Sequence, residues 1–117
     1  MSHEKYAACI DACYDCAKEC DHCATACLKE DDVKMMAKCI ETDMYCADIC
    51  RTAATFMARG DMFSSEICGL CAEICDACAE ECEKHEADHC KRCAEACRRC
   101  ADECRKMAKS TAGHMHN

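Results

Sequence analysis

Apolar and charged residues follow each other along this chain with the spacing of amphipathic helices. Between Cys9 and Cys27 the cysteines recur at intervals of 4, 3, 4, 3 and 4 residues, and charged residues fill many of the positions between them. Residues three and four apart share one face of a helix, and this rhythm is that of a coiled-coil seam. The pattern predicts four helices, over residues 3–28, 33–58, 62–84 and 88–109.

Short polar segments separate the predicted helices. The KEDD turn offers Asp31 or Asp32 as a cap for the second helix. Gly60 follows the second helix at the place of a left-handed residue, and Asp61 can cap the third. Short connections favour antiparallel neighbours, so we expect an all-α, up-down-up-down four-helix bundle. The bundle is expected to span residues 1–109, followed by a flexible tail containing His and Met over residues 110–117.

Cysteine occupies the seam of every predicted helix. Each helix carries one stripe of sulfur, and no cysteine lies off it. The stripe of the first helix is about 27 Å long at about 1.5 Å per residue. Facing inward, the four stripes would give the bundle a cysteine-lined core. The expected core cysteines are Cys9, Cys13, Cys16, Cys20, Cys23, Cys27, Cys39, Cys46, Cys50, Cys68, Cys71, Cys75, Cys78, Cys82, Cys90, Cys93, Cys97, Cys100 and Cys104.

The composition argues that these thiols have a chemical role. There are 19 cysteines in 117 residues, far above ordinary usage. Cysteine is smaller than leucine, so a purely structural cysteine core would be thin and poorly filled. A disulfide scaffold is disfavoured because 19 is odd and because neighbours along one helix orient poorly for the bond.

Charge and the N-terminus limit the partners and the compartment. A net charge of −8 argues against nucleic acid, and the basic residues of the last helix alternate with acidic ones, as on a solvated face. We find no signal-peptide pattern at the N-terminus and no apolar run of 18 residues. The expected location is the cytoplasm, without membrane contact, where thiols stay reduced and cysteine patterns usually indicate metal or catalysis.

The thiol pattern favours copper(I) over other chemistry. Six CxxC units lie within helical periodicity instead of the turns typical of zinc ribbons, and the absence of strands disfavours a dithiol redox enzyme. Cu(I) is soft and prefers thiolates, and each ion replaces one thiol proton, so a one-to-one filling leaves the core neutral. Four thiolates around Zn²⁺ would leave a charge of −2 at every site. A zinc or mixed-metal thiolate buffer is the first alternative, and a thiol redox protein is the second.

Four short-looped helices with inward C-x3-C-x2-C repeats resemble the copper storage protein family. The resemblance covers residues 1–107 and, without a signal peptide, is similar to the cytosolic branch. It implies that the chain is not an enzyme and stores many Cu(I) ions, each held mainly by two thiolates. It also implies a homotetramer and a role in copper detoxification, copper supply or both.

The ends of the seam carry other soft ligands. Met36, His85 and His89 are expected at one end, and Tyr6, Met57, Met62 and Met107 at the other. Imidazole and thioether groups can ligate copper, and the resemblance implies a mouth at one end, which we place at His85 and His89. At the other end we expect the three methionines to plug the core.

Two features depart from this pattern. Asp43 lies on the sulfur stripe, where it would accept a hydrogen bond from a thiol, ligate metal weakly, or lie where the bundle opens; a buried carboxylate needs partners. His114, Met115 and His116 form a trio on the tail that would either capture copper outside the bundle or have no role. We therefore count Asp43, His85 and His89 with the cysteines as candidate metal ligands.

Overall fold

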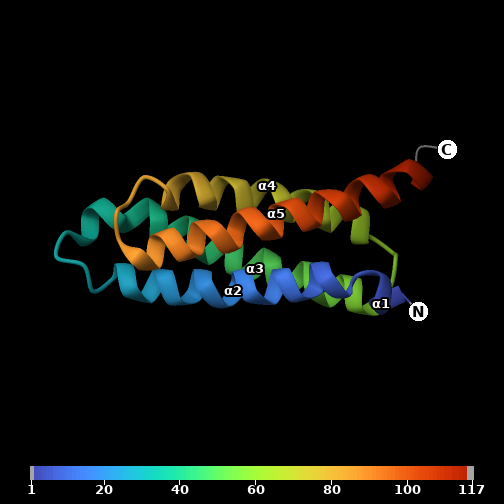
Figure 1. Cartoon of the computed structure of the whole chain (residues 1–117), viewed down its shortest axis with the longest axis horizontal. Coiled ribbons are helices and arrows are strands. Elements are labelled where there is room, and N and C mark those ends of the chain that lie inside the picture. The colour runs from blue at the N-terminus through green and yellow to red at the C-terminus, as the bar shows by residue number, and fades with distance from the viewer. Residues whose placement is uncertain (1, 116–117) are drawn as a thin grey trace.

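The structure is a computed structural model that describes the backbone of residues 2–115 and the side chains of residues 4–108. Its helices run antiparallel in chain order, so the up-down-up-down four-helix bundle is confirmed (Figure 1). Both chain termini lie at one end, and the 28–36 and 83–87 connections lie at the other. None of the helices in the described range is long and apolar enough to span a membrane. The elements are α1 (Ser2–Lys5), α2 (Ala7–Cys27), η1 (Val33–Met36), α3 (Ala37–Arg59), α4 (Ser64–Cys82) and α5 (Asp88–Met115).

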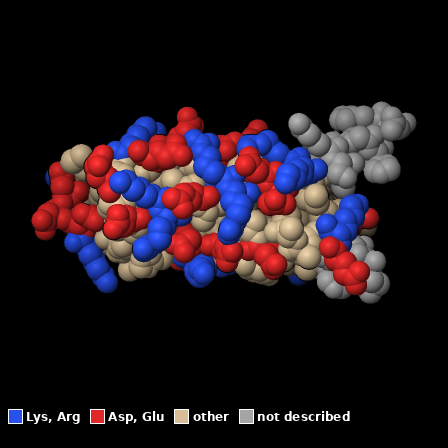
Figure 2. Space-filling model, in the orientation of Figure 1, with Lys and Arg blue, Asp and Glu red and all other residues tan. Residues whose placement is uncertain are grey.

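Cysteine and alanine build the core. All 19 cysteines are buried, and they share the interior with alanines such as Ala17, Ala54, Ala79 and Ala101. Small side chains at the contacts let helix axes approach closely, so four thiol stripes can meet along one axis. Charged residues cover the outside: Figure 2 shows basic and acidic side chains interspersed on the face formed by α2, α4 and α5. The mixed-charge surface expected for the last helix is therefore present.

Several helix boundaries differ from the prediction; the third helix, for example, is shorter at both ends, Ser64–Cys82. The first helix is interrupted at Tyr6, whose buried side chain donates a hydrogen bond to Asp61 Oδ1 at 2.7 Å across the end of the bundle. The second begins with a 3-10 turn, η1, before α3. The last continues to Met115 and not to residue 109. The predictions for the side chains of His114, Met115 and His116 fall outside the described residues.

The turn between α3 and α4 corrects two predictions. Gly60 has φ 141° and ψ −156°, a positive-φ conformation that favours glycine but is not the left-handed helical one. The N-cap of α4 is Phe63 and not Asp61, and Phe63 itself has left-handed geometry, with φ 66°. Ser64 Oγ closes the turn by donating to the Gly60 carbonyl at 2.6 Å. A rule that looks for a polar N-cap residue misses this turn. The hydrogen bond that closes the turn comes from Ser64, the first residue of α4, and the N-cap residue Phe63 makes no side-chain hydrogen bond.

Replacing Phe63 by glycine is expected to stabilise the metal-free protein. A left-handed backbone costs a residue with a Cβ roughly 1 kcal/mol, which glycine avoids, and the Phe63 ring is exposed. We expect the free energy of unfolding in urea to rise by up to about 1 kcal/mol. The matched control is Phe63→Ala, which removes the ring but keeps the strained backbone. An equal change in both variants would contradict the strain account.

Candidate metal centre

The cysteine side chains form a packed array of sulfur along the bundle axis. Eighteen of the nineteen Sγ atoms have another cysteine Sγ within 4.0 Å, and that of Cys68 lies 3.5 Å from Met57 Sδ. Many of these contacts join different helices. The inward stripe predicted from the spacing is thus present in every helix, and each thiol has neighbours able to share a metal ion.

The centre of the bundle shows how the helices combine their thiols. Cys16 of α2 lies 3.6 Å from both Cys46 of α3 and Cys97 of α5. Cys46 in turn lies 3.6 Å from Cys75 of α4 and 3.8 Å from Cys97. Four helices therefore supply ligand atoms to one small volume.

Several sets of four thiols could hold a metal ion. In each set the four Sγ atoms lie within 4.8 Å of one another, and three of the five sets named below share members, so these three overlap along the axis. Overlapping sets suit bridging thiolates and many ions better than isolated sites. Five of these sets are Cys13/Cys71/Cys100/Cys104, Cys16/Cys46/Cys50/Cys75, Cys16/Cys20/Cys46/Cys97, Cys20/Cys78/Cys93/Cys97 and Cys23/Cys27/Cys39/Cys90.

The end of the bundle near the termini is closed by Tyr6 and Met57. Both side chains are fully buried, and Met57 Sδ accepts from the Cys68 thiol. Burial and the hydrogen bond to Asp61 raise the pKa of Tyr6 to about 12, so its hydroxyl stays protonated. Met107 is partly buried against the core, as expected of a plug. Met62 is 76% exposed, so its predicted place in the plug is wrong; it lies in the turn before Phe63 and points into solvent.

His89 lies at the opposite end, directly on the thiols. Its Nδ1 is 3.5 Å from the Sγ atoms of both Cys23 and Cys90 and 3.9 Å from that of Cys27. Its Nε2 is 2.9 Å from Glu30 Oε2, which fixes the ring orientation. Burial alone would lower the pKa of His89, but the hydrogen bonds to Glu30 and Cys23 outweigh it and the net pKa is raised.

His85 is held differently. Its Nε2 lies 3.0 Å from Glu81 Oε2, one helical turn earlier, and both side chains are largely buried. The structure therefore brings His89 to the thiols, whereas His85 contacts a carboxylate.

Met36, predicted for the same end, is buried with Cys39 in the core. Sequence reasoning did not identify Glu30 and Glu81, because charged residues near helix ends are common and only the fold brings Glu30 to His89.

Asp43 is fully buried among thiols, with no exposed surface. Its Oδ1 accepts hydrogen bonds from Cys78 at 3.2 Å and from Cys93 at 3.3 Å, and Cys82 lies at 3.6 Å. Of the three interpretations of Asp43, the structure agrees with the one in which the carboxyl accepts hydrogen bonds from thiols. It excludes the one in which Asp43 lies where the bundle opens, because the side chain is fully buried. Burial, followed by the nearby Cys78 and Cys23 sulfurs, raises the pKa of Asp43 to about 10, so the carboxyl is protonated at neutral pH.

Two of the thiols near His89, those of Cys27 and Cys90, are also held in their neutral form. Burial and the adjacent Cys23 sulfur raise the pKa of Cys90 to about 11. Burial likewise raises the pKa of Cys27, again with Cys23 contributing. In the absence of metal these groups keep their protons, so an incoming cation must displace them. A monovalent ion then leaves the interior charge unchanged, while a divalent ion adds buried charge unless it displaces two protons.

Comparison with known proteins places the chain in a family. A sequence model described as "Csp: Copper storage protein" matches residues 2–109. The cysteine-rich protein YhjQ of Bacillus subtilis (strain 168) is 52% identical over 70 residues, which is 59% of this chain and about 65% of the length of that relative.

Solved structures agree along most of the chain. Cu(I)-bound copper storage protein BsCsp3 is 51% identical with a TM-score of 0.84, covering 88% of this chain and 97% of its own. The apo form of Csp3 from Bacillus subtilis has the same identity and TM-score and covers 88% and 98%. A cytosolic copper storage protein from Streptomyces lividans, described with five coppers, is 39% identical with a TM-score of 0.88, covering 92% and 95%. By sequence and by structure, this chain belongs to the copper storage protein family.

Proposed function

We propose that this chain stores Cu(I) by exchanging the protons of its core thiols for copper, with roughly one ion for each cysteine. The observation that carries the proposal is the array of nineteen buried cysteines whose sulfurs contact one another across all four helices. Such an array gives every ion two or more sulfur neighbours, which suits a soft monovalent cation. Sequestered ions are kept away from other cellular ligands, which serves detoxification, supply or both.

The proposal assigns no catalysis to the thiols. Each loading step exchanges one Cu(I) for one proton on sulfur, and no bond to carbon is made or broken. All nineteen cysteines, with His89 at the mouth, belong to the proposed ligand set. Asp43 is assigned as a hydrogen-bonding neighbour of the ligands, and His85 as a side chain paired with Glu81.

A zinc buffer is the second candidate, because sets of four thiols within 4.8 Å also match the number of ligands in a structural zinc site. Charge disfavours zinc: each Zn²⁺ with four thiolates carries −2, and the sets follow one another along one narrow core. Filling neighbouring sets would accumulate buried charge.

Replacing Cys16, Cys46 and Cys97 together by serine tests the store. These three sulfurs lie within 3.6–3.8 Å of one another at the centre. We expect the Cu(I) capacity to fall by about three ions or more, since neighbouring sites lose shared ligands. The measurement is anaerobic titration with chelator competition. The control also makes three substitutions by serine, at Thr25, Thr42 and Thr52, whose side chains lie outside the sulfur core. A capacity equal to that of the unmodified protein would contradict a core store.

Copper uptake is proposed to begin at the His89 end. His89→Ala is expected to weaken binding of the first copper ions by about tenfold, because it removes a nitrogen ligand beside Cys23 and Cys90. His85→Ala is the matched control, since that ring contacts Glu81. The measurement is competition with a chelator at substoichiometric copper. Equal losses in both variants, or none in His89→Ala, would contradict the assignment.

The proposal places the protein in the cytoplasm as a homotetramer. The cytosolic description of the Streptomyces lividans relative supports the location. Exposed apolar side chains on the bundle surface, among them Met44, Tyr45 and Leu70, support self-association. Size-exclusion chromatography with light scattering measures the number of chains directly.

A further inference from the structure

The row of sulfur atoms in α3 ends in a thioether and not in a thiol. Met57 lies seven residues, or two helical turns, after Cys50, so the two side chains project from the same face of α3. Met57 Sδ is 3.5 Å from Cys68 Sγ of α4, and both side chains are fully buried. In the metal-free protein the Cys68 thiol donates a hydrogen bond to this thioether. The contact therefore joins two helices through a pair of soft donor atoms.

Two further thiols lie beside this pair. Hydrogen bonding with Cys104 lowers the pKa of Cys68, but hydrogen bonding with Cys9 and burial raise it to a net value of about 12. Cys9 Sγ is in turn 3.6 Å from Cys104 Sγ. Cys68 therefore has both thiol and thioether neighbours, and an ion bound to it could also be shared with the rest of the sulfur array.

Tyr6 closes the same end of the bundle but is not available as a ligand. Its hydroxyl donates a hydrogen bond to Asp61 Oδ1 at 2.7 Å, and its pKa of about 12 keeps the proton in place. A phenol oxygen is also a harder donor than sulfur and suits Cu(I) less well. Of the two side chains that close this end, Met57 is the one with a donor atom suited to copper.

Charge explains why a neutral donor suits the end of the array. In the proposed store each Cu(I) replaces one thiol proton, so the core stays neutral when ions and thiolates are equal in number. A further thiolate at the end of the row would add a buried negative charge unless it brought its own copper ion. The thioether of Met57 supplies a soft sulfur atom without a charge. At the opposite end His89 Nδ1 likewise extends the row of thiols with a donor that is not a thiolate.

We propose that Met57 Sδ and Cys68 Sγ together bind a Cu(I) ion, so that Met57 is a copper ligand as well as a packing side chain. On loading, Cys68 releases its proton to solvent, and copper takes the place of that proton between the two sulfur atoms. No electron is transferred, and the charge of the site does not change. Thiolate and thioether ligands both select Cu(I). The inference rests on the proposed copper store and adds a ligand to it.

A crystal structure of the fully loaded, full-length protein tests the site directly, with anomalous scattering at the copper edge to locate the ions. We expect a copper ion about 2.3 Å from Met57 Sδ, the length of a zinc–sulfur bond, and bonded also to Cys68 Sγ. A loaded core in which no copper is bonded to Met57 Sδ would overturn the site and leave the store intact. A protein that binds only a few copper ions would contradict the store itself, and this inference with it.

Met57→Leu tests the same site in solution, because leucine keeps a buried apolar side chain of similar volume and lacks the sulfur. We expect one copper ion per chain to be bound at least about tenfold more weakly, since even a lost contact to a ligand has an effect of that size. The measurement is chelator competition close to saturation.

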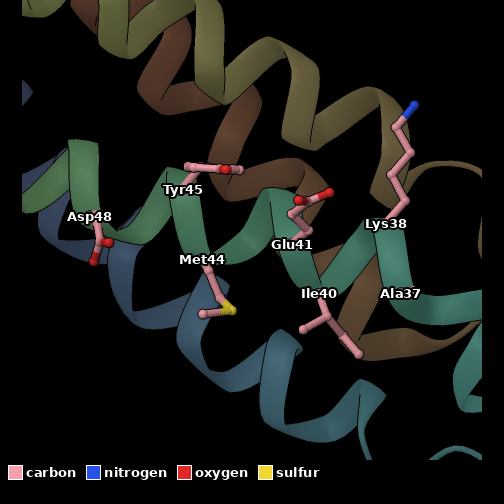
Figure 3. A pocket seen from close by; sticks show the side chains of 7 residues that line it. All are labelled: Ala37, Lys38, Ile40, Glu41, Met44, Tyr45 and Asp48. Carbon is pink, nitrogen blue, oxygen red and sulfur yellow. The ribbon is translucent and has the colours of Figure 1, made fainter.

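The matched control is Met44→Leu. Met44 is 59% exposed and lines a groove on the outside of α3, away from the sulfur core (Figure 3). This variant is expected to bind copper like the unmodified protein. Urea unfolding of both metal-free variants checks that each is folded before copper is added. Equal copper affinities in Met57→Leu and Met44→Leu would overturn the proposal.

Discussion

Saturation with Cu(I) is expected to raise the midpoint of thermal unfolding of the reduced protein by more than about 20 °C. A ligand bound only by the folded chain stabilises it by about 1.4 kcal/mol for each tenfold excess over its dissociation constant, and roughly 1 kcal/mol shifts the midpoint of a domain of this size by about 4 °C. The buried core of the described residues consists mainly of cysteine and alanine, so copper–sulfur bonds between helices would dominate its cohesion.

Differential scanning calorimetry under argon measures the shift, with aliquots at increasing copper-to-protein ratios. The shift is expected to grow as copper is added up to saturation, because every ion joins thiols of the folded bundle. The variant lacking the Cys16, Cys46 and Cys97 thiols provides the control and should gain less. A midpoint that stops rising after four or five ions would indicate a few closed sites instead of a store.

Replacing Asp43 by asparagine is expected to make the stability of the metal-free protein less dependent on pH. Burial and the adjacent sulfurs raise the pKa of Asp43 from 3.8 to about 10. The folded chain therefore keeps a proton that the unfolded chain releases above about pH 4. The stability contributed by this group is complete below about pH 4 and is lost progressively as the pH rises toward 10.

This linkage has a measurable consequence between pH 5 and pH 7.5. The buried carboxyl lowers the free energy of unfolding of the unmodified protein by up to about 1.4 kcal/mol per pH unit, and Asp43→Asn removes that dependence. Urea unfolding at several pH values, with reduced and metal-free protein, measures it. Asp11→Asn, which neutralises an exposed carboxylate of α2, is the control. Identical pH profiles for the unmodified protein and Asp43→Asn would mean that Asp43 is ionised in the core.

The sulfur stripes and their helices were predictable because a spacing of three and four residues has one physical meaning in a helix. Once Cys16, Cys46 and Cys97 are assigned to inward seams, a four-helix bundle must place them near one another on its axis, so their proximity could be predicted from the sequence alone. The place of Asp43 on the sulfur stripe followed from the same spacing, whereas its burial among the thiols is shown only by the structure. Cysteine and alanine are small enough that no tertiary conflict disturbs this pattern.

The ends of the bundle were less predictable because they depend on contacts between residues far apart in the chain. The break at Tyr6 results from its hydrogen bond to Asp61, 55 residues away. Met62 and Met57 are similar in sequence context, but the strained turn at Phe63 leaves the first in solvent and the second in the core. His85 and His89 likewise look equivalent in sequence: the spacing of four residues from Glu81 offers His85 a partner, but only the fold brings His89 to the thiols.

The most direct test of the central claim is an anaerobic titration of the fully reduced protein with Cu(I) against a competing chelator, in parallel with Zn²⁺. The account predicts more than about a dozen tightly bound Cu(I) ions per chain, since each proton exchanged on sulfur keeps the core neutral, and weak zinc uptake. Saturation at four or five metal ions with a preference for zinc would contradict it and would indicate discrete tetrahedral sites.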